Sequence, residues 1–208
     1  MDLPDDLVLP LSSGEPWWYW LGGRPSLDFV NTLRERWWRS VETLVTPADL
    51  ALWLERAELL EPGSAAHPSM ALLRRTRELR ESIDTALVAV TRGEGIEPRA
   101  LQTIDTWLPA AVTHQTLAPG REGAPLLAAA APADPLEHAI GRVALDAARM
   151  LGAPEQRARV RVCASDTCSA RFYDRSPTAG RLWCSMRACG NAAKARRHRE
   201  RTREARGS

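Results

Sequence analysis

Four cysteines limit the possible folds of this chain more than any other feature of its sequence. They form two pairs, each with four residues between its members, and fifteen residues separate the pairs. The residues concerned are Cys163, Cys168, Cys184 and Cys189. Two tight turns that each supply two thiolates make the ligand set of a tetrahedral zinc ion. The spacing therefore predicts one structural Zn²⁺, because four protein ligands leave no coordination position open for catalysis.

Two other states of the cysteines have to be weighed, namely two disulfide bonds or four unrelated buried thiols. Residues 1–6 are acidic and lack the basic start and apolar core of a signal peptide. We therefore expect a cytoplasmic protein, in which disulfides are rare. The equal spacing of the two pairs disfavours unrelated thiols.

The longest small-apolar stretch, residues 124–133, is interrupted by prolines and too short to span a bilayer, so no membrane association is expected.

Charge is divided unevenly along the chain. Residues 1–156 carry a formal net charge of −8, whereas residues 157–208 carry +10. Such asymmetry indicates that the basic part binds a polyanion. The candidate nucleic-acid-binding residues are Lys194, Arg196, Arg197, Arg199, Arg201 and Arg203.

These basic residues belong to a segment that is predicted to be helical. Residues 190–206 contain no helix breaker after Gly190, so a helix is expected to follow the second cysteine pair directly. The alternative to a phosphate-binding surface is a solvated helix whose Arg–Glu pairs contribute little. A neutral stripe at helical spacing is expected to lie on the zinc module, and it consists of Asn191, Ala195, His198, Thr202 and Ala205.

Apolar spacing and capping residues predict five helices before the cysteines. They cover residues 27–38, 46–60, 69–91, 98–108 and 134–152. Glycines and prolines between short apolar pieces predict a hairpin over residues 113–131.

The cysteine-bearing part has strand patterns instead. Alternating arginine and small apolar residues predict a strand over residues 157–162. A second hairpin, made of residues 170–174 and 181–183, is expected between the cysteine pairs. In this arrangement Phe172 and Trp183 cover the metal site.

An aromatic segment near the N-terminus is a candidate ligand site. Five of the eight tryptophans lie within residues 17–38, and Asp28 and Asn31 are spaced to share a helical face among them. Polar groups within an aromatic wall are typical of a small-molecule pocket. The candidate pocket residues are Asp28, Asn31, Trp17 and Trp37. Two alternatives are a Trp-rich core, in which Asp28 caps a helix and Asn31 pairs with backbone groups, and a dimer interface.

Several motifs together resemble a known family. They are Cys163-x4-Cys168, Phe172-Tyr173-Asp174, Arg181-Leu182-Trp183-Cys184, Cys189-Gly190-Asn191 followed by Lys194, and the segment 22–32. The sequence is similar to bacterial proteins with an N-terminal ABATE domain and a C-terminal CGNR zinc finger. This resemblance implies a stress-induced transcription regulator whose finger binds DNA. The chain has Ala192 where the signature of that family has arginine.

The expected fold is mainly α. A helical N-terminal domain with a short hairpin is predicted over residues 1–155. A small α+β, treble-clef-like zinc finger with a basic C-terminal helix is predicted over residues 156–208.

The expected function is that of a DNA-binding transcriptional regulator, associated with the nucleoid when bound. A small-molecule effector and a homodimer are compatible with the aromatic segment. The alternative is a zinc-stabilised RNA- or protein-interaction module without ligand sensing. No Gly-rich phosphate loop, Gly-x-Ser-x-Gly elbow or His-Glu-x-x-His pair occurs in the sequence, so enzymatic activity is not expected.

Overall fold

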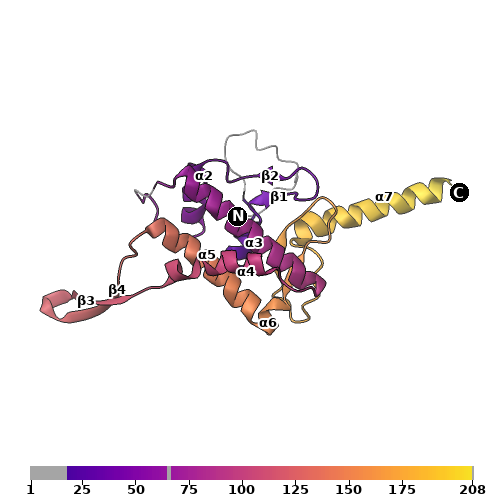
Figure 1. The fold of residues 1–208 in the computed structure, drawn as a ribbon. Coiled ribbons are helices and arrows are strands. Elements are labelled where there is room, and N and C mark those ends of the chain that lie inside the picture. Colours follow the sequence, from indigo (N-terminus) through magenta and orange to yellow (C-terminus); the bar gives the residue numbers. More distant parts are fainter. Residues whose placement is uncertain (1–17, 65–66, 208) are drawn as a thin grey trace.

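The computed structural model describes residues 18–64 and 67–207. Within these ranges the chain is mainly helical, with small two-stranded antiparallel sheets, as its sequence predicts (Figure 1). The helices are α1 (Pro25–Val30), α2 (Pro47–Arg56), α3 (Met70–Arg92), α4 (Pro98–Asp105), α5 (Pro135–Gly152), α6 (Pro154–Arg157) and α7 (Asn191–Gly207). The strand pairs are β1 (Leu33–Arg34) with β2 (Val41–Glu42), β3 (Gln115–Pro119) with β4 (Pro125–Ala129), and β5 (Val160–Val162) with β6 (Arg171–Tyr173).

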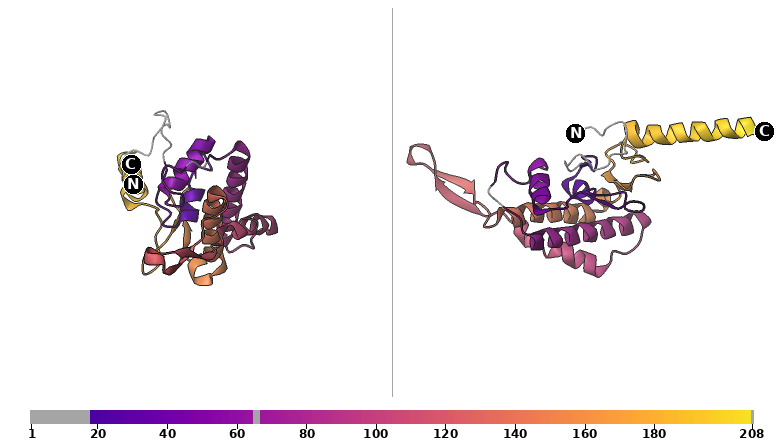
Figure 2. Two further views of the ribbon diagram at one scale, coloured as in Figure 1. Left: turned by 90° about the vertical axis from the view of Figure 1, so that its left-hand side faces the viewer. Right: turned by 90° about the horizontal axis from the view of Figure 1, so that it is seen from above.

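The apolar core lies between α3 and α5, with α1, α2 and α4 packed around them (Figures 1 and 2). Helix α3 contributes Leu79, Ile83 and Leu87, which recur every four residues and are fully buried. Val160 of β5 is buried in the same core, so the strand next to the cysteines is anchored in the helical part.

Capping side chains fix where the main helices begin. Thr46 accepts a hydrogen bond from the backbone N–H of Asp49, whose carboxylate accepts one from the N–H of Thr46. Ser69 and Asp134 cap α3 and α5 in a similar way. The predicted helix start at Thr46 is thus confirmed, although α2 and α4 end earlier than the sequence predicts, at Arg56 and Asp105.

The helix predicted over residues 27–38 is wrong in its second half. Helix α1 ends at Val30, and the chain turns into β1, which pairs with β2. Glu35 and Ser40 have positive φ angles of 51° and 50° in the turn between these strands. The apolar spacing was misleading because the two tryptophans of this turn are not core residues, and Trp37 and Trp38 are 51% and 64% exposed.

The predicted hairpin is confirmed as β3–β4, and it projects from the end of the molecule opposite to α7 (Figures 1 and 2). Gly120 is required in its turn, because a Cβ there would lie 2.6 Å from the carbonyl oxygen of Ala124. Leu117 is 72% exposed, so the strands are held mainly by their own ladder.

The strand pairing around the cysteines differs from the prediction. Strand β6 pairs with β5, which precedes it in sequence, and not with residues 181–183. The first cysteine pair therefore lies on the connection between two paired strands. Residues 175–180 instead fold back because the buried Asp174 carboxylate accepts hydrogen bonds from the N–H groups of Ser176 and Arg181. Helix α6, which the sequence analysis did not predict, begins with Pro154 at its first position.

No helix among residues 18–64 and 67–207 is both long and apolar enough to cross a membrane.

Candidate metal centre and basic helix

The four cysteine sulfur atoms meet in one buried cluster and all lie within 4.8 Å of one another. Sγ of Cys184 lies 3.8 Å from Sγ of Cys168 and 3.7 Å from Sγ of Cys189. Four sulfurs bound tetrahedrally at about 2.3 Å from zinc would be separated by roughly 3.8 Å. A disulfide would require about 2.05 Å, so the cysteines are free thiols. The donor set and its spacing fit one structural zinc ion.

Two different backbone devices bring the cysteine pairs together. Cys163 directly follows β5 and Cys168 closely precedes β6, so the β5–β6 pairing brings the first pair together. In the second pair, Cys184 precedes a π-helical turn, Met186–Gly190, that leads into α7, and Cys189 lies within this turn. A Cβ on Gly190 would lie 2.8 Å from the sulfur of Met186, so a larger residue here would require the Met186 side chain to move.

A small apolar cluster surrounds the sulfur atoms, as the sequence predicts. Phe172 is fully buried beside the cysteines, and Trp183 packs against the same cluster. The Arg181 guanidinium stacks 5.0 Å from the centre of the Phe172 ring and donates a 2.8 Å hydrogen bond to the carbonyl of Cys184. These contacts exclude water from one side of the candidate metal site.

Contacts among the sulfur atoms shift the pKa values of the cysteines in opposite directions. Hydrogen bonds from the thiols of Cys168, Cys184 and Cys189 lower the pKa of Cys163. Contacts with Cys163 and Cys168 raise the pKa values of Cys184 and Cys189. A cation that binds all four as thiolates must therefore displace protons, which makes its affinity depend on pH.

Helix α7 leaves the second cysteine pair and extends away from the rest of the molecule (Figures 1 and 2). All six candidate nucleic-acid-binding residues lie on it. Of these, Arg196 is half-buried, and the other five are exposed. Arg196 forms an ion pair of 3.0 Å with Asp166, which lies between the first two cysteines.

The predicted neutral stripe does not lie on the zinc module. Asn191, Ala195 and His198 are exposed, whereas Ala193 is buried at the base of the helix. The reason is that α7 projects from the molecule and is packed only at its N-terminal end, against the turn Met186–Gly190. No long face of the helix is therefore covered. Ala192 is also exposed on the first turn, so the departure from the family signature falls on the surface.

A polar seam joins the cysteine-bearing part to the helical part. The Asn31 side chain donates to the carbonyl of Arg171 and accepts from its N–H, at 2.9 and 2.8 Å. The Arg171 guanidinium donates two hydrogen bonds to Asp84 of α3, at 2.7 and 3.0 Å. Arg36 lies 3.3 Å from the same carboxylate and 2.5 Å from Glu81. Sequence reasoning missed this seam, because no local pattern relates α3 to β6.

Of the candidate pocket residues that the structure describes, Asn31 lines a cavity between the helical part and the cysteine-bearing part, and Asp28 and Trp37 do not. Asp28 accepts a 2.7 Å hydrogen bond from the N–H of Gly22, and burial raises the pKa of Asp28 to about 7. Asn31 is used in the seam, and Trp37 stacks on Arg171 with 5.1 Å between guanidinium and ring centre. Trp17 lies outside the described residues. Asn31 therefore pairs with backbone groups, as the Trp-rich-core alternative describes, whereas Asp28 does not cap α1, whose N-cap residue is Arg24.

Two parts of the chain match known protein families. Residues 23–154 match the ABATE family, whose description reads "Putative stress-induced transcription regulator". Residues 159–202 match the CGNR zinc finger. The search of curated proteins found no match. The second match contains all four clustered cysteines, so the cluster is the four-cysteine zinc site of this finger.

Proposed function

Because this chain belongs to the ABATE family and carries a CGNR zinc finger, we propose that it is a transcription regulator that binds duplex DNA through α7. The observation that carries the proposal is a projecting, arginine-rich helix anchored directly to a zinc site. Seventeen residues of helix span about 25 Å, which is enough to follow a DNA groove over several base pairs.

The zinc finger holds this helix in place. When bound, the zinc ion cross-links the two cysteine pairs and so stabilises a module that has only a small core of its own. Gly190 and the capping hydroxyl of Ser185, which accepts from the N–H of Ala188, set the turn from Cys184 into α7. The helix axis is thereby fixed relative to the metal.

The charge on α7 supports phosphate contacts. Lys194, Arg197 and Arg201 recur at helical spacing and are exposed. Among the described residues, none of the three forms an ion pair, so their donors are available to a partner. Each phosphate that they neutralise would release counterions and make the affinity depend on salt.

The test is a titration of the full chain with a mixed-sequence DNA duplex at several salt concentrations. Removal of residues 191–208 should abolish binding. The affinity falls as salt rises, so the slope of log K against log salt is negative. Its magnitude should decrease by about one in each of Lys194→Ala, Arg197→Ala and Arg201→Ala. Arg74→Ala is the matched control, because Arg74 is an exposed arginine on α3, far in sequence from the finger, and should leave the slope unchanged. Salt-independent binding would contradict the proposal.

A duplex RNA of the same sequence distinguishes the alternative function. If the protein is instead an RNA-binding module, RNA should compete for α7 more strongly than DNA does. If it is a protein-interaction module, neither duplex should bind with a salt-dependent affinity.

We further propose that the ABATE domain responds to a small ligand, since its surface meets the finger along the Asn31–Arg171 seam.

A further inference from the structure

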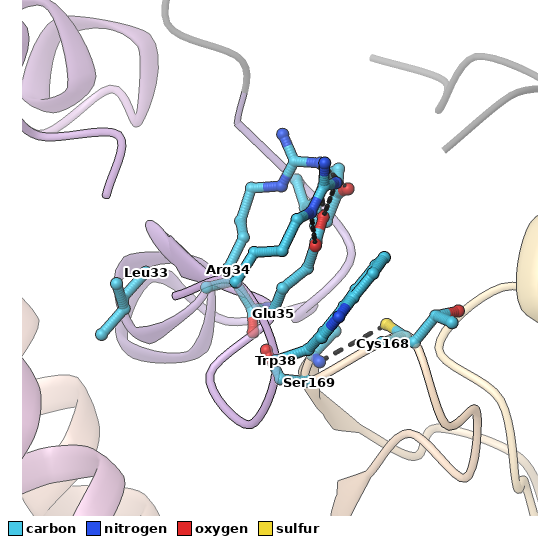
Figure 3. Close-up of a pocket in the computed structure, with 11 residues that line it drawn as sticks. Leu33, Arg34, Glu35, Trp38, Cys168 and Ser169 are labelled. Atoms are coloured by element: carbon cyan, nitrogen blue, oxygen red, sulfur yellow. Dashed lines mark hydrogen bonds and ion pairs between the residues drawn. The ribbon is translucent and has the colours of Figure 1, made fainter. Parts of the chain in front are cut away.

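A cavity of about 160 Å³ lies between the helical part and the zinc finger (Figure 3). Its wall is mostly apolar, and it lies beside the turn between β1 and β2. The lining includes Tyr19, Leu33, Arg34 and Trp38 from the helical part and Cys168 and Ala170 from the finger. An apolar cavity of similar size, about 150 Å³, admits benzene. The volume therefore suits one aromatic ring or a group of that size.

Arg34 is the exceptional member of this wall. Its side chain is 1% exposed, yet its buried Nε and Nη1 atoms have no hydrogen-bond partner among the described residues. Its Nη2 atom donates to the hydroxyl of Tyr19, and its guanidinium lies 4.1 Å from the centre of the Tyr19 ring. Buried guanidinium nitrogens without an acceptor are costly, so they point to a missing acceptor.

The neighbouring carboxylate does not neutralise Arg34. Glu35 is engaged by Arg39, which donates hydrogen bonds of 2.5 and 2.8 Å to its two oxygens. The closest approach of Glu35 to Arg34 is 3.8 Å. Two guanidinium groups thus share one carboxylate in this wall.

Two further groups favour an anionic aromatic ligand. Burial raises the pKa of Tyr19, so its hydroxyl stays protonated and can donate into the site while it accepts from Arg34. The Trp38 ring offers an apolar wall, held by the Arg39 guanidinium 4.9 Å from its centre. Side-chain rotation on binding is common, and it would allow a carboxylate to reach the unused nitrogens of Arg34.

We propose that this cavity binds a small aromatic carboxylic acid, with its ring between Leu33, Trp38 and Ala170 and its carboxylate on Arg34. Such a ligand would contact both the ABATE domain and the finger next to the metal ligand Cys168. This deepens the ligand response proposed above and rests on it. The binding test below contains no DNA, so it can fail while DNA binding stands.

The first experiment varies the ligand and leaves the protein unchanged. Benzoate, benzamide and benzylammonium have the same ring but a negative, neutral or positive group. Ligand-observed NMR titration of the zinc-loaded full chain should show benzoate binding at least about tenfold more tightly than benzamide, since a hydrogen bond to a charged group exceeds about 1.4 kcal/mol. Benzylammonium should not bind. Equal binding of benzoate and benzamide, or no binding of benzoate, would overturn the proposal.

The second experiment locates the site with a matched pair of tryptophans. Both Trp37 and Trp38 are exposed on the same turn, but only Trp38 lines the cavity. Trp38→Ala should weaken benzoate binding at least about fivefold, and Trp37→Ala should change it less than about twofold, because only Trp38 presents its ring to the ligand. Equal effects of the two substitutions would place the site elsewhere.

The third experiment tests the charge. Arg34→Gln should bring the benzoate-to-benzamide affinity ratio close to one, with zinc content and melting temperature recorded for the same sample. If Arg34 serves only to balance the nearby thiolates, the substitution should lower zinc retention and leave the ratio unchanged, which would contradict the proposal. Should Arg34→Gln fail to fold, the ligand series and the tryptophan pair still decide it.

Discussion

At the scale of single residues, zinc binding depends on the four cysteine sulfur atoms. Each cysteine supplies one of four sulfurs at tetrahedral spacing, and serine cannot replace any of them as a zinc ligand. Asp28 shows the opposite case. Its carboxylate is half-buried and accepts a hydrogen bond from the N–H of Gly22, and burial disfavours its charged form.

Cys184→Ser should reduce bound zinc from about one ion per chain to nearly none, because structural zinc needs all four thiolates. Metal content after gel filtration, measured by atomic emission, checks this. Ser165→Ala is a control of similar size, since Ser165 lies between the first two ligands without joining the cluster. Full zinc content in Cys184→Ser would contradict the assignment.

Asp28→Asn should stabilise the protein more at pH 8 than at pH 5. The pKa of Asp28 is about 7 in the folded chain, above its ordinary value of 3.8, so the folded state binds the extra proton. Stability from this group is complete below the unfolded value and is lost as pH rises through 7.

The difference in unfolding free energy between Asp28→Asn and the parent chain should therefore grow by roughly 2 kcal/mol from pH 5 to pH 8. Urea unfolding of both proteins at each pH measures it, and other titrating groups cancel in the difference. A pH-independent difference would show that Asp28 is charged throughout.

At the scale of elements, a buried ion pair in the seam joins β6 to α3. Asp84 accepts two hydrogen bonds from Arg171, whose side chain is 3% exposed. A buried charge that loses its partner is expensive, whereas a partly exposed pair contributes little. Helix α3 takes part in both kinds of pair, because Arg75 of α3 and Glu137 of α5 are 58% and 39% exposed.

Asp84→Asn should lower the free energy of unfolding by about 3 kcal/mol, because it leaves the Arg171 charge buried and unpaired. Glu137→Gln, which removes the exposed ion pair with Arg75 of the same helix α3, should cost about 1 kcal/mol or less. Chemical denaturation of both variants makes the comparison. Similar losses in the two would mean that the seam is not buried in solution.

The β3–β4 arm offers the complementary case. It packs mainly on itself and carries exposed leucines. Replacement of residues 115–129 by a short Gly–Ser linker should shift the melting temperature by no more than about 3 °C, since the main core contains none of these residues. A large shift would show that the arm is covered in solution.

At the scale of the whole molecule, the zinc finger and the helical part are not independent. Val160 lies in the main core, and Asn31 binds the backbone of β6. Contacts with the helical part therefore stabilise the finger in addition to its metal. Even so, its own apolar cluster is small, and the metal contributes about 10–16 kcal/mol in isolated small fingers.

Removal of zinc with a strong chelator should therefore unfold the finger before the helical part. Hydrogen exchange should show lost protection around Cys163–Gly190 and in α7, and retained protection in α3 and α5, whose core is separate. Added Zn²⁺ should restore the original pattern. Simultaneous loss of protection in α3 would indicate a single cooperative unit.

Features that depend on neighbouring residues could be predicted from the sequence alone. Cysteine spacing predicted the metal site, Thr46 and Asp134 marked helix starts, and the residues after Gly190 predicted the basic helix. Each depends on periodicity, capping or ligand spacing, which act over a few residues.

Contacts between distant segments, in contrast, are seen only in the folded chain. Asp84 and Arg171 are 87 positions apart, and their ion pair follows from no local pattern. The same holds for the end of α1 at Val30, where the polar residues that follow turn away to reach α3 and β6. The cavity beside Arg34 likewise exists only because the finger docks against the turn that carries Trp38. Burial and long-range pairing set these features, since a charged side chain in a protein interior is stable only where the fold brings a partner.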